Sequence, residues 1–106
     1  MIKTVFVYIT TASVAEAQGI ARTLVGDRLA ACANILPAMQ SIYHWEGRVE
    51  EGEETVLILK ARAELFPAVD SRVRELHSYK TPCIVALPVT EGSAPYLDWL
   101  ARETKP

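Results

Sequence analysis

Two cysteines and one of the two histidines are the residues of this sequence best suited to metal chemistry. Thiolate and imidazole are the ligands that copper and zinc prefer in proteins. Cys32 follows a run of small residues, and His77 and Cys83 stand six residues apart across an expected turn. We therefore take Cys32, His77 and Cys83 as candidate ligands for a metal ion such as copper or zinc. Neither cysteine belongs to a CxxC pair, so the spacing itself does not specify a metal.

Each candidate ligand also has a purely structural interpretation. A free cysteine such as Cys32 often serves as a small buried hydrophobic residue. His77 is expected at the end of a helix, where an imidazole can bind the last free carbonyl groups. His44, between Tyr43 and Trp45, is most simply a histidine on the face of a strand. The sequence leaves these alternatives open.

A second set of residues could line a cleft between subunits. Tyr43, Trp45 and Tyr79 supply aromatic rings, and Lys60 or Lys80 could hold a small anionic effector. Aromatic residues also concentrate at ordinary subunit interfaces, so packing is the competing interpretation. The sequence predicts a cleft or an interface at these residues without choosing between them.

Catalytic motifs are lacking from the sequence. It has no glycine-rich phosphate loop, no nucleophile elbow and no HExxH pair. Its two histidines have no obvious acidic partner that would orient them for catalysis. We therefore expect a protein that is not an enzyme.

Length and composition limit the remaining classes. With 106 residues, half of them hydrophobic, the chain predicts a single domain over residues 1–106. A net charge of −2 gives no basic surface for nucleic acid or anionic lipid, and no apolar run approaches the about 20 residues of a membrane span. The start of the chain lacks the pattern of a signal peptide, so we expect a cytoplasmic protein that binds neither nucleic acid nor membrane.

The first segments predict a strand followed by a helix. Residues 5–9 are apolar and rich in β-branched side chains, which favours a strand. Ser13 followed three residues later by Glu16 is typical of a capping box at the start of a helix. Apolar residues then recur at helical spacing, so the helix is expected to end near Asp27.

Residues 31–60 predict a long β-hairpin. Its expected turn is the acidic segment Glu50–Glu54, where Gly52 is free to adopt a positive φ. The apolar run 55–59 then forms the returning arm. Pro37 predicts that the first arm is an edge strand or contains a bulge, because proline lacks an amide donor.

The last part of the chain predicts a helix, a strand and a short final helix. The second helix is expected to end near His77, before the break at Pro82. An apolar strand follows at residues 84–87, and Pro88 favours a place at the edge of the sheet. Ser93 can cap the final helix.

The order β-α-β-β-α-β is typical of the α+β, ferredoxin-like sandwich, here with a long β-hairpin and a C-terminal helix. Right-handed crossovers place both main helices on one face of a four-stranded sheet, with the first and third strands in the centre. The strands are apolar on both faces, so the face without these helices would be exposed apolar surface. We therefore expect a homo-oligomer that buries this face; the alternative is a monomer whose final helix folds over it.

The motifs of the chain resemble a known family. Four segments carry the resemblance, in order and at matching spacing: Leu29–Pro37, Ser41–Gly47, Leu87–Val89 and Tyr96–Leu100. They are similar to those of the CutA family of divalent-cation tolerance proteins. This resemblance implies a ferredoxin-like subunit in a homotrimer similar to the PII signalling proteins. It also implies a cytoplasmic role in tolerance of copper and other divalent metal ions.

The sequence departs from the family pattern between residues 77 and 83. Lys80 stands where a carboxylate is common, and Cys83 replaces a glutamate after the proline. Cys83 would be a softer ligand that favours Cu(I) or Zn. Two functions remain open: a metal-responsive protein that binds copper, and a PII-like module whose cleft binds a small metabolite or a protein partner.

Overall fold

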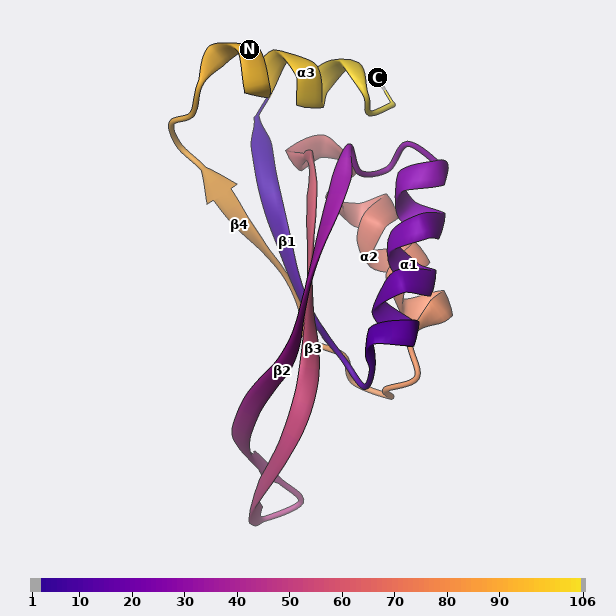
Figure 1. Ribbon diagram of the computed structural model, residues 1–106, viewed down its shortest axis with the longest axis vertical. Coiled ribbons are helices and arrows are strands. Elements are labelled where there is room, and N and C mark those ends of the chain that lie inside the picture. Colours follow the sequence, from indigo (N-terminus) through magenta and orange to yellow (C-terminus); the bar gives the residue numbers. More distant parts are fainter. Residues whose placement is uncertain (1–2, 106) are drawn as a thin grey trace.

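The computed structural model describes residues 3–105 and shows an α+β fold of the ferredoxin-like type (Figure 1). The elements in chain order are β1 (Thr4–Thr11), α1 (Val14–Gly26), β2 (Cys32–Trp45), β3 (Arg48–Arg62), a short 3-10 helix η1 (Ala63–Leu65), α2 (Phe66–Leu76), β4 (Ile84–Val89) and α3 (Ala94–Arg102). The sheet has the order β2-β3-β1-β4, with every neighbouring pair antiparallel. The prediction that the first and third strands are central is confirmed.

The first helix begins as its sequence predicts, with one difference. The Ser13 hydroxyl accepts a hydrogen bond from the Glu16 amide at 3.1 Å, which is the first half of a capping box. The Glu16 carboxylate does not return to the Ser13 amide. It accepts instead from the amides of Ala12 at 2.9 Å and Ser78 at 2.7 Å. Glu16 therefore joins the start of α1 to the loop that follows α2.

The turn of the long hairpin lies at Glu46–Gly47, so its prediction at Glu50–Glu54 is wrong. Glu46 and Gly47 have φ values of 50° and 79°. Positive φ at both central residues is the geometry that connects twisted antiparallel strands through a two-residue turn. Gly52 lies inside β3, paired with Ser41. The acidic residues therefore extend the strand, and the hairpin projects beyond the rest of the sheet (Figure 1).

Pro37 and Pro88 lie in edge strands, as the sequence predicts. Pro37 lies in β2, where the register with β3 shifts between Leu36 and Met39, and Ala38 has a φ of 64°. The strand therefore has an irregularity at Pro37 and is also an edge strand, as expected for a residue without an amide donor. Pro88 lies in β4, the opposite edge.

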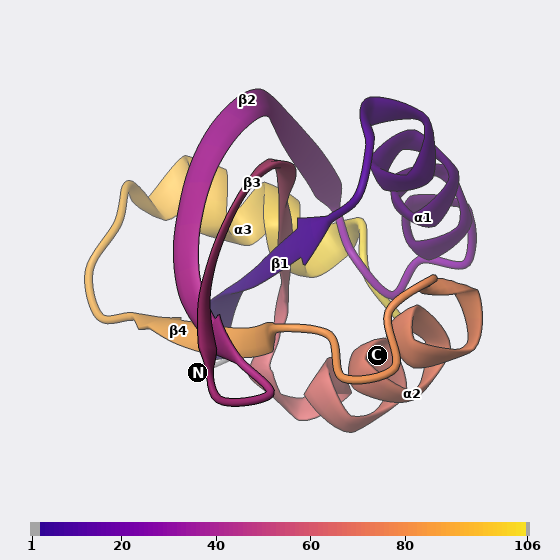
Figure 2. The same cartoon turned by 90° about the horizontal axis from the view of Figure 1, so that it is seen from below.

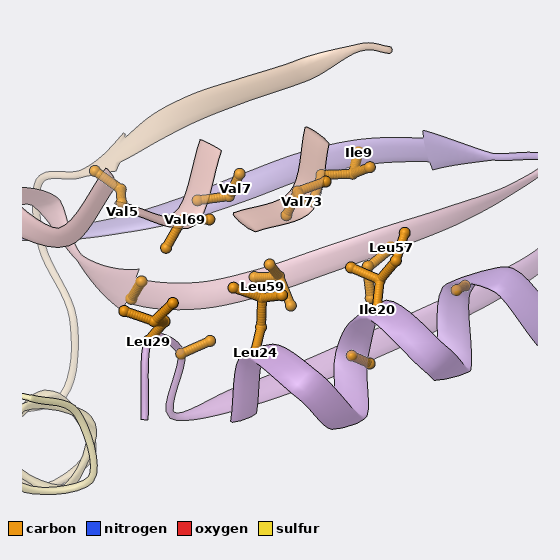
Figure 3. Close-up of a cluster of buried hydrophobic side chains, with 14 residues drawn as sticks. Val5, Val7, Ile9, Ile20, Leu24, Leu29, Leu57, Leu59, Val69 and Val73 are labelled. Atoms are coloured by element: carbon orange, nitrogen blue, oxygen red, sulfur yellow. The ribbon is translucent and has the colours of Figure 1, made fainter. Parts of the chain in front are cut away.

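The hydrophobic core lies between the sheet and the helices α1 and α2. Alternate residues of β1 and β3 point into it, because successive side chains of a strand point to opposite faces. Figure 3 shows them meeting the side chains of the two helices; the labelled residues are Val5, Val7, Ile9, Ile20, Leu24, Leu29, Leu57, Leu59, Val69 and Val73. Most of these side chains have no solvent exposure. On this face the side chains of the two central strands are therefore covered within the chain.

The final helix covers only one end of the other face. Helix α3 crosses the end of the sheet that is opposite the hairpin turn (Figures 1 and 2), and its Leu100 is fully buried. Elsewhere on the face opposite α1 and α2, which we call the open face, Val85 and Leu87 of β4 are 45% and 51% exposed. The alternative to a homo-oligomer, in which the final helix folds over the whole open face, is therefore not what the structure shows.

Candidate functional site

The three predicted metal ligands do not come together within one chain. Cys32 begins the edge strand β2 and pairs with Lys60, whereas Cys83 directly precedes β4 on the opposite edge. Opposite edges of a four-stranded sheet are roughly 14 Å apart. Among residues 3–105, no three side chains of histidine, cysteine, aspartate or glutamate form a group that could hold a metal ion. The residues present therefore do not fit a metal centre built by a single chain.

His77 is buried and both of its ring nitrogens are used by the fold. Its side chain has no solvent exposure. Nε2 lies 2.8 Å from the carbonyl oxygen of Thr10, and Nδ1 lies 3.0 Å from the amide nitrogen of Tyr79. A carbonyl only accepts and an amide only donates, so Nε2 carries the proton and Nδ1 accepts. A metal ion could bind His77 only by breaking one of these bonds.

A cavity of about 640 Å³ is lined in part by the segment that follows His77. The first arm of the hairpin forms one wall, the segment 79–83 forms another, and Tyr8 and Thr10 contribute from β1. The predicted cleft residues Tyr43, Trp45 and Tyr79 all line it; Lys80, Cys83, Met39 and Glu54 do so as well. Residues far apart in the sequence thus form one aromatic site with a single carboxylate.

Glu54 contributes a negative charge to the lining of this cavity. The Tyr79 hydroxyl donates a hydrogen bond of 2.8 Å to Glu54 Oε2. Burial raises the pKa of Tyr79, and the hydrogen bond and negative charge of Glu54 raise it further. Burial also raises the pKa of the Cys83 thiol, with a contribution from the same carboxylate. At neutral pH Cys83 is therefore a thiol, which is a weaker metal ligand than a thiolate.

Lys60 lies outside this cavity, in a second cluster at the end of the sheet under α3. Its ammonium group lies 5.2 Å from the ring centre of Phe6 and 5.5 Å from that of Tyr96. Hydrogen bonding to Tyr96 raises the pKa of Lys60, outweighing the opposite effect of burial, and nearby Cys32 acts in the same direction. Cys32 Sγ is 3.7 Å from the Tyr96 hydroxyl oxygen. The predicted cleft residues thus lie in two separate sites: Tyr43, Trp45 and Tyr79 line the cavity, and Lys60 lies in the cluster under α3.

Sequence reasoning did not identify Tyr8, Met39 and Glu54 as part of the cavity. The Tyr8 hydroxyl donates to Met39 Sδ at 3.2 Å, which connects β1 to the hairpin arm. Alternation along β1 could have placed Tyr8 on the open face, since Val7 and Ile9 point into the core. Glu54 was hidden because its segment was predicted to be a turn rather than a strand.

The architecture defines a class of protein, a small ferredoxin-like fold with an extended β-hairpin. The family model described as "CutA1 divalent ion tolerance protein" matches residues 5–103. A solved structure of the divalent cation tolerance protein from Thermus thermophilus is similar, with a TM-score of 0.94 and 47% identity over 96% of this chain and 99% of that one. The protein belongs to the CutA1 family.

Other relatives come from diverse organisms. Divalent-cation tolerance protein CutA of Thermus thermophilus is 49% identical over 92% of this chain and 95% of its own length. Human protein CutA is 40% identical over 92% of this chain but only 55% of its own length. A structure described as a periplasmic CutA from Archaeoglobus fulgidus has a TM-score of 0.93 at 42% identity, covering 96% of this chain and 99% of that one. No helix within residues 3–105 has the length and apolar character needed to span a membrane.

Proposed function

We propose that this protein acts in the tolerance of divalent metal ions, as a cytoplasmic, non-enzymatic homotrimer that binds copper or a related ion. The observation that carries this proposal is the family match over residues 5–103, nearly the whole described chain. The printed names of its relatives refer to divalent cations. Copper, the trimer and the cytoplasmic location are the finer parts of the proposal, and they rest on the resemblance of the motifs.

The exposed apolar residues support the homo-oligomer. Leu36, Val85 and Leu87 on the sheet are 52%, 45% and 51% exposed, and Ile42 and Val49 on the hairpin are 71% and 62% exposed. Single exposed hydrophobic residues are ordinary, but a group along one sheet and its hairpin is typical of an interaction surface. Other copies of the chain would bury this group, and the long hairpin would reach between subunits.

The separation of the candidate ligands supports metal binding between subunits rather than within one. Cys32 and Cys83 lie on opposite edges of the sheet, and His77 is held by the fold. A shared site would therefore combine a thiol of one copy with groups of another. Coordination by a metal cation would favour the thiolate form of either cysteine.

Native mass spectrometry with and without Cu(I), Cu(II) and Zn(II) tests this proposal, because it reports subunit number and bound metal together. We expect a trimer that binds metal in a saturable way, with loss of binding in Cys32→Ser or Cys83→Ser. Unchanged binding in both variants would exclude the two thiols as ligands. A single-chain species at micromolar concentration would contradict the assembly.

A second candidate function is a PII-like module that binds a small molecule or a protein partner. The cavity supports it, because it combines three of the four predicted cleft residues, Tyr43, Trp45 and Tyr79, with polar groups. Cavities of this volume and mixed lining are typical of small-molecule sites. Thermal stabilisation by a small molecule in the presence of a metal chelator would favour this function over metal binding.

A further inference from the structure

The cavity lined by Tyr8, Tyr43, Trp45 and Tyr79 has a composition that selects among ligands by charge. Four aromatic side chains from three parts of the chain line one space of about 640 Å³. Aromatic rings bind apolar groups, and their faces also attract cations, because the π-electrons of the ring are negative at the face. The lining therefore suits a ligand with a flat apolar part, and it tolerates positive charge better than negative charge.

Glu54 adds a negative charge to the same space. It pairs with Met39 in the ladder between β2 and β3, two positions before Val56 of the open face, so its side chain points to the open face. The residue is partly buried, and Tyr79 holds Oε2 through the 2.8 Å hydrogen bond. A carboxylate accepts several hydrogen bonds, so the bond from Tyr79 leaves capacity for a donor on a ligand.

Within the part of the chain that the structure describes, Glu54 is the one carboxylate in the lining of this cavity. Its negative charge attracts a positively charged ligand group and repels an anionic one.

Lys80 is the cationic residue of the lining, and it does not reverse this preference. Its side chain belongs to an exposed residue, whereas Glu54 and Tyr79 are partly buried. Water screens an exposed ammonium group strongly, and screens a partly buried carboxylate less. The positive charge of Lys80 is therefore screened more strongly than the negative charge of Glu54.

We infer that this cavity is a binding site for a small organic cation, in which the aromatic residues hold a flat apolar body and Glu54 pairs with an ammonium or guanidinium group. The inference rests on the second candidate function, a small-molecule module, and names the chemical class of its ligand. It opposes the sequence-based expectation of an anionic effector. Lys60, one of the two residues invoked for that effector, lies at a different place, against Phe6 and Tyr96.

Three compounds of similar size and different charge test the ligand class: 2-phenylethylamine, 2-phenylethanol and 3-phenylpropionate. Binding is measured by isothermal titration calorimetry at neutral pH and low salt, with the full chain in its solution assembly and a metal chelator present. We expect the amine to bind about ten-fold more tightly than the alcohol, a difference typical of one favourable charge interaction. The carboxylate should bind most weakly.

Glu54→Gln separates charge from shape, because the amide oxygen can still accept from Tyr79. We expect this variant to lose the roughly ten-fold preference for the amine over the alcohol. Glu53→Gln is the matched control, since Glu53 is exposed, pairs with Gln40 and points to the opposite face; it should keep the preference. Lys80→Gln should keep or increase it.

Each result decides between the hypotheses. Equal or tighter binding of 3-phenylpropionate, or an unchanged preference in Glu54→Gln, overturns the organic-cation class while the small-molecule function stands. If none of the three compounds binds, the cavity is not a site for small aromatic cations and the inference is wrong. Metal tolerance and trimer formation are judged separately, by mass spectrometry.

Discussion

The two faces of the sheet differ although the same strands build both. On the face toward α1 and α2, Val7, Ile9, Leu57 and Leu59 have no solvent exposure. On the open face, the residues of β4 that pair with Tyr8 and Phe6 are Val85 and Leu87, which are about half exposed. The apolar side chains are of similar kind on both faces, so the difference comes from what covers them.

This difference assigns separate roles to the two faces. The covered face is complete within one chain, because two helices supply the side chains that fill it. The open face has α3 only at the end near Lys60. Its remaining surface holds the aromatic cavity and the exposed apolar residues Leu36, Val85 and Leu87. The face toward α1 and α2 thus contributes most of the stability of the chain. The open face provides the surface that is available to partners or ligands.

The largest expected effect comes from removing one leucine from each face. Leu59→Ala should lower the free energy of unfolding by about 2–5 kcal/mol, because it leaves a cavity in a close-packed core. Leu87→Ala, its matched counterpart, should change chain stability by less than about 1 kcal/mol and should mainly weaken association. Denaturant unfolding at several protein concentrations, with analytical ultracentrifugation, distinguishes these effects. Equal costs at both sites would remove the contrast between the faces.

A smaller loss is expected when the loop between the faces loses its anchor. His77→Ala should cost about 1–3 kcal/mol, because it leaves the Thr10 carbonyl and the Tyr79 amide without their partner. His44→Ala is the control, since His44 is exposed on the hairpin, and it should change stability by less than about 0.5 kcal/mol. Thermal unfolding of both variants measures the difference. A neutral His77→Ala would show that the loop is held by other contacts.

A substitution in the hairpin turn should lower the free energy of unfolding by about 1 kcal/mol. Gly47→Ala should destabilise by roughly this amount, because Gly47 has a φ of 79° and a side chain there is strained even though the added Cβ meets no atom within 4 Å. Gly52→Ala is the matched control, with equally open space and no positive φ, and should be neutral or slightly stabilising. Chemical denaturation measures the free energy of unfolding of both variants. A larger loss in Gly52→Ala than in Gly47→Ala would support a turn at residues 50–54 instead.

The smallest effect concerns pH and Glu16. Burial raises the pKa of Glu16, but the hydrogen bonds from Ala12 and Ser78 and the charge of the nearby His77 outweigh it, so the pKa lies below its ordinary value of 4.5. A lowered folded-state pKa stabilises the protein above pH 4.5, and this stabilisation is lost as pH falls through the folded-state pKa. Glu16→Gln should therefore be less stable than the wild type at pH 7, by about 0.5–1 kcal/mol, the size of a charge interaction at a helix start.

The measurement for Glu16 is the midpoint of urea unfolding between pH 3 and 7. The gap between Glu16→Gln and the wild type should narrow as the pH drops below 4.5. Glu51→Gln, which changes an exposed carboxylate on the hairpin, should track the wild type across the range. A gap that does not change with pH would assign the effect of Glu16 to geometry rather than charge.

The order and kind of the elements were predictable from the sequence, because hydrophobic periodicity, helix caps and prolines act locally. Ser13 and Pro95 lie at the starts of helices, and Pro37 and Pro88 lie in edge strands. The uncovered apolar face was predictable for the same reason, since alternation along each strand is visible in the sequence. These features need no knowledge of which distant residues meet.

Only the tertiary structure decided the turn, the role of His77 and the composition of the cavity. The turn depends on the register of β2 against β3, which moved Glu54 from a predicted turn into a strand beside Tyr79. His77 finds its partner Thr10 at a separation of 67 residues. Which distant residues come into contact depends on the packing and register of the whole sheet. Local residue preferences do not determine these contacts.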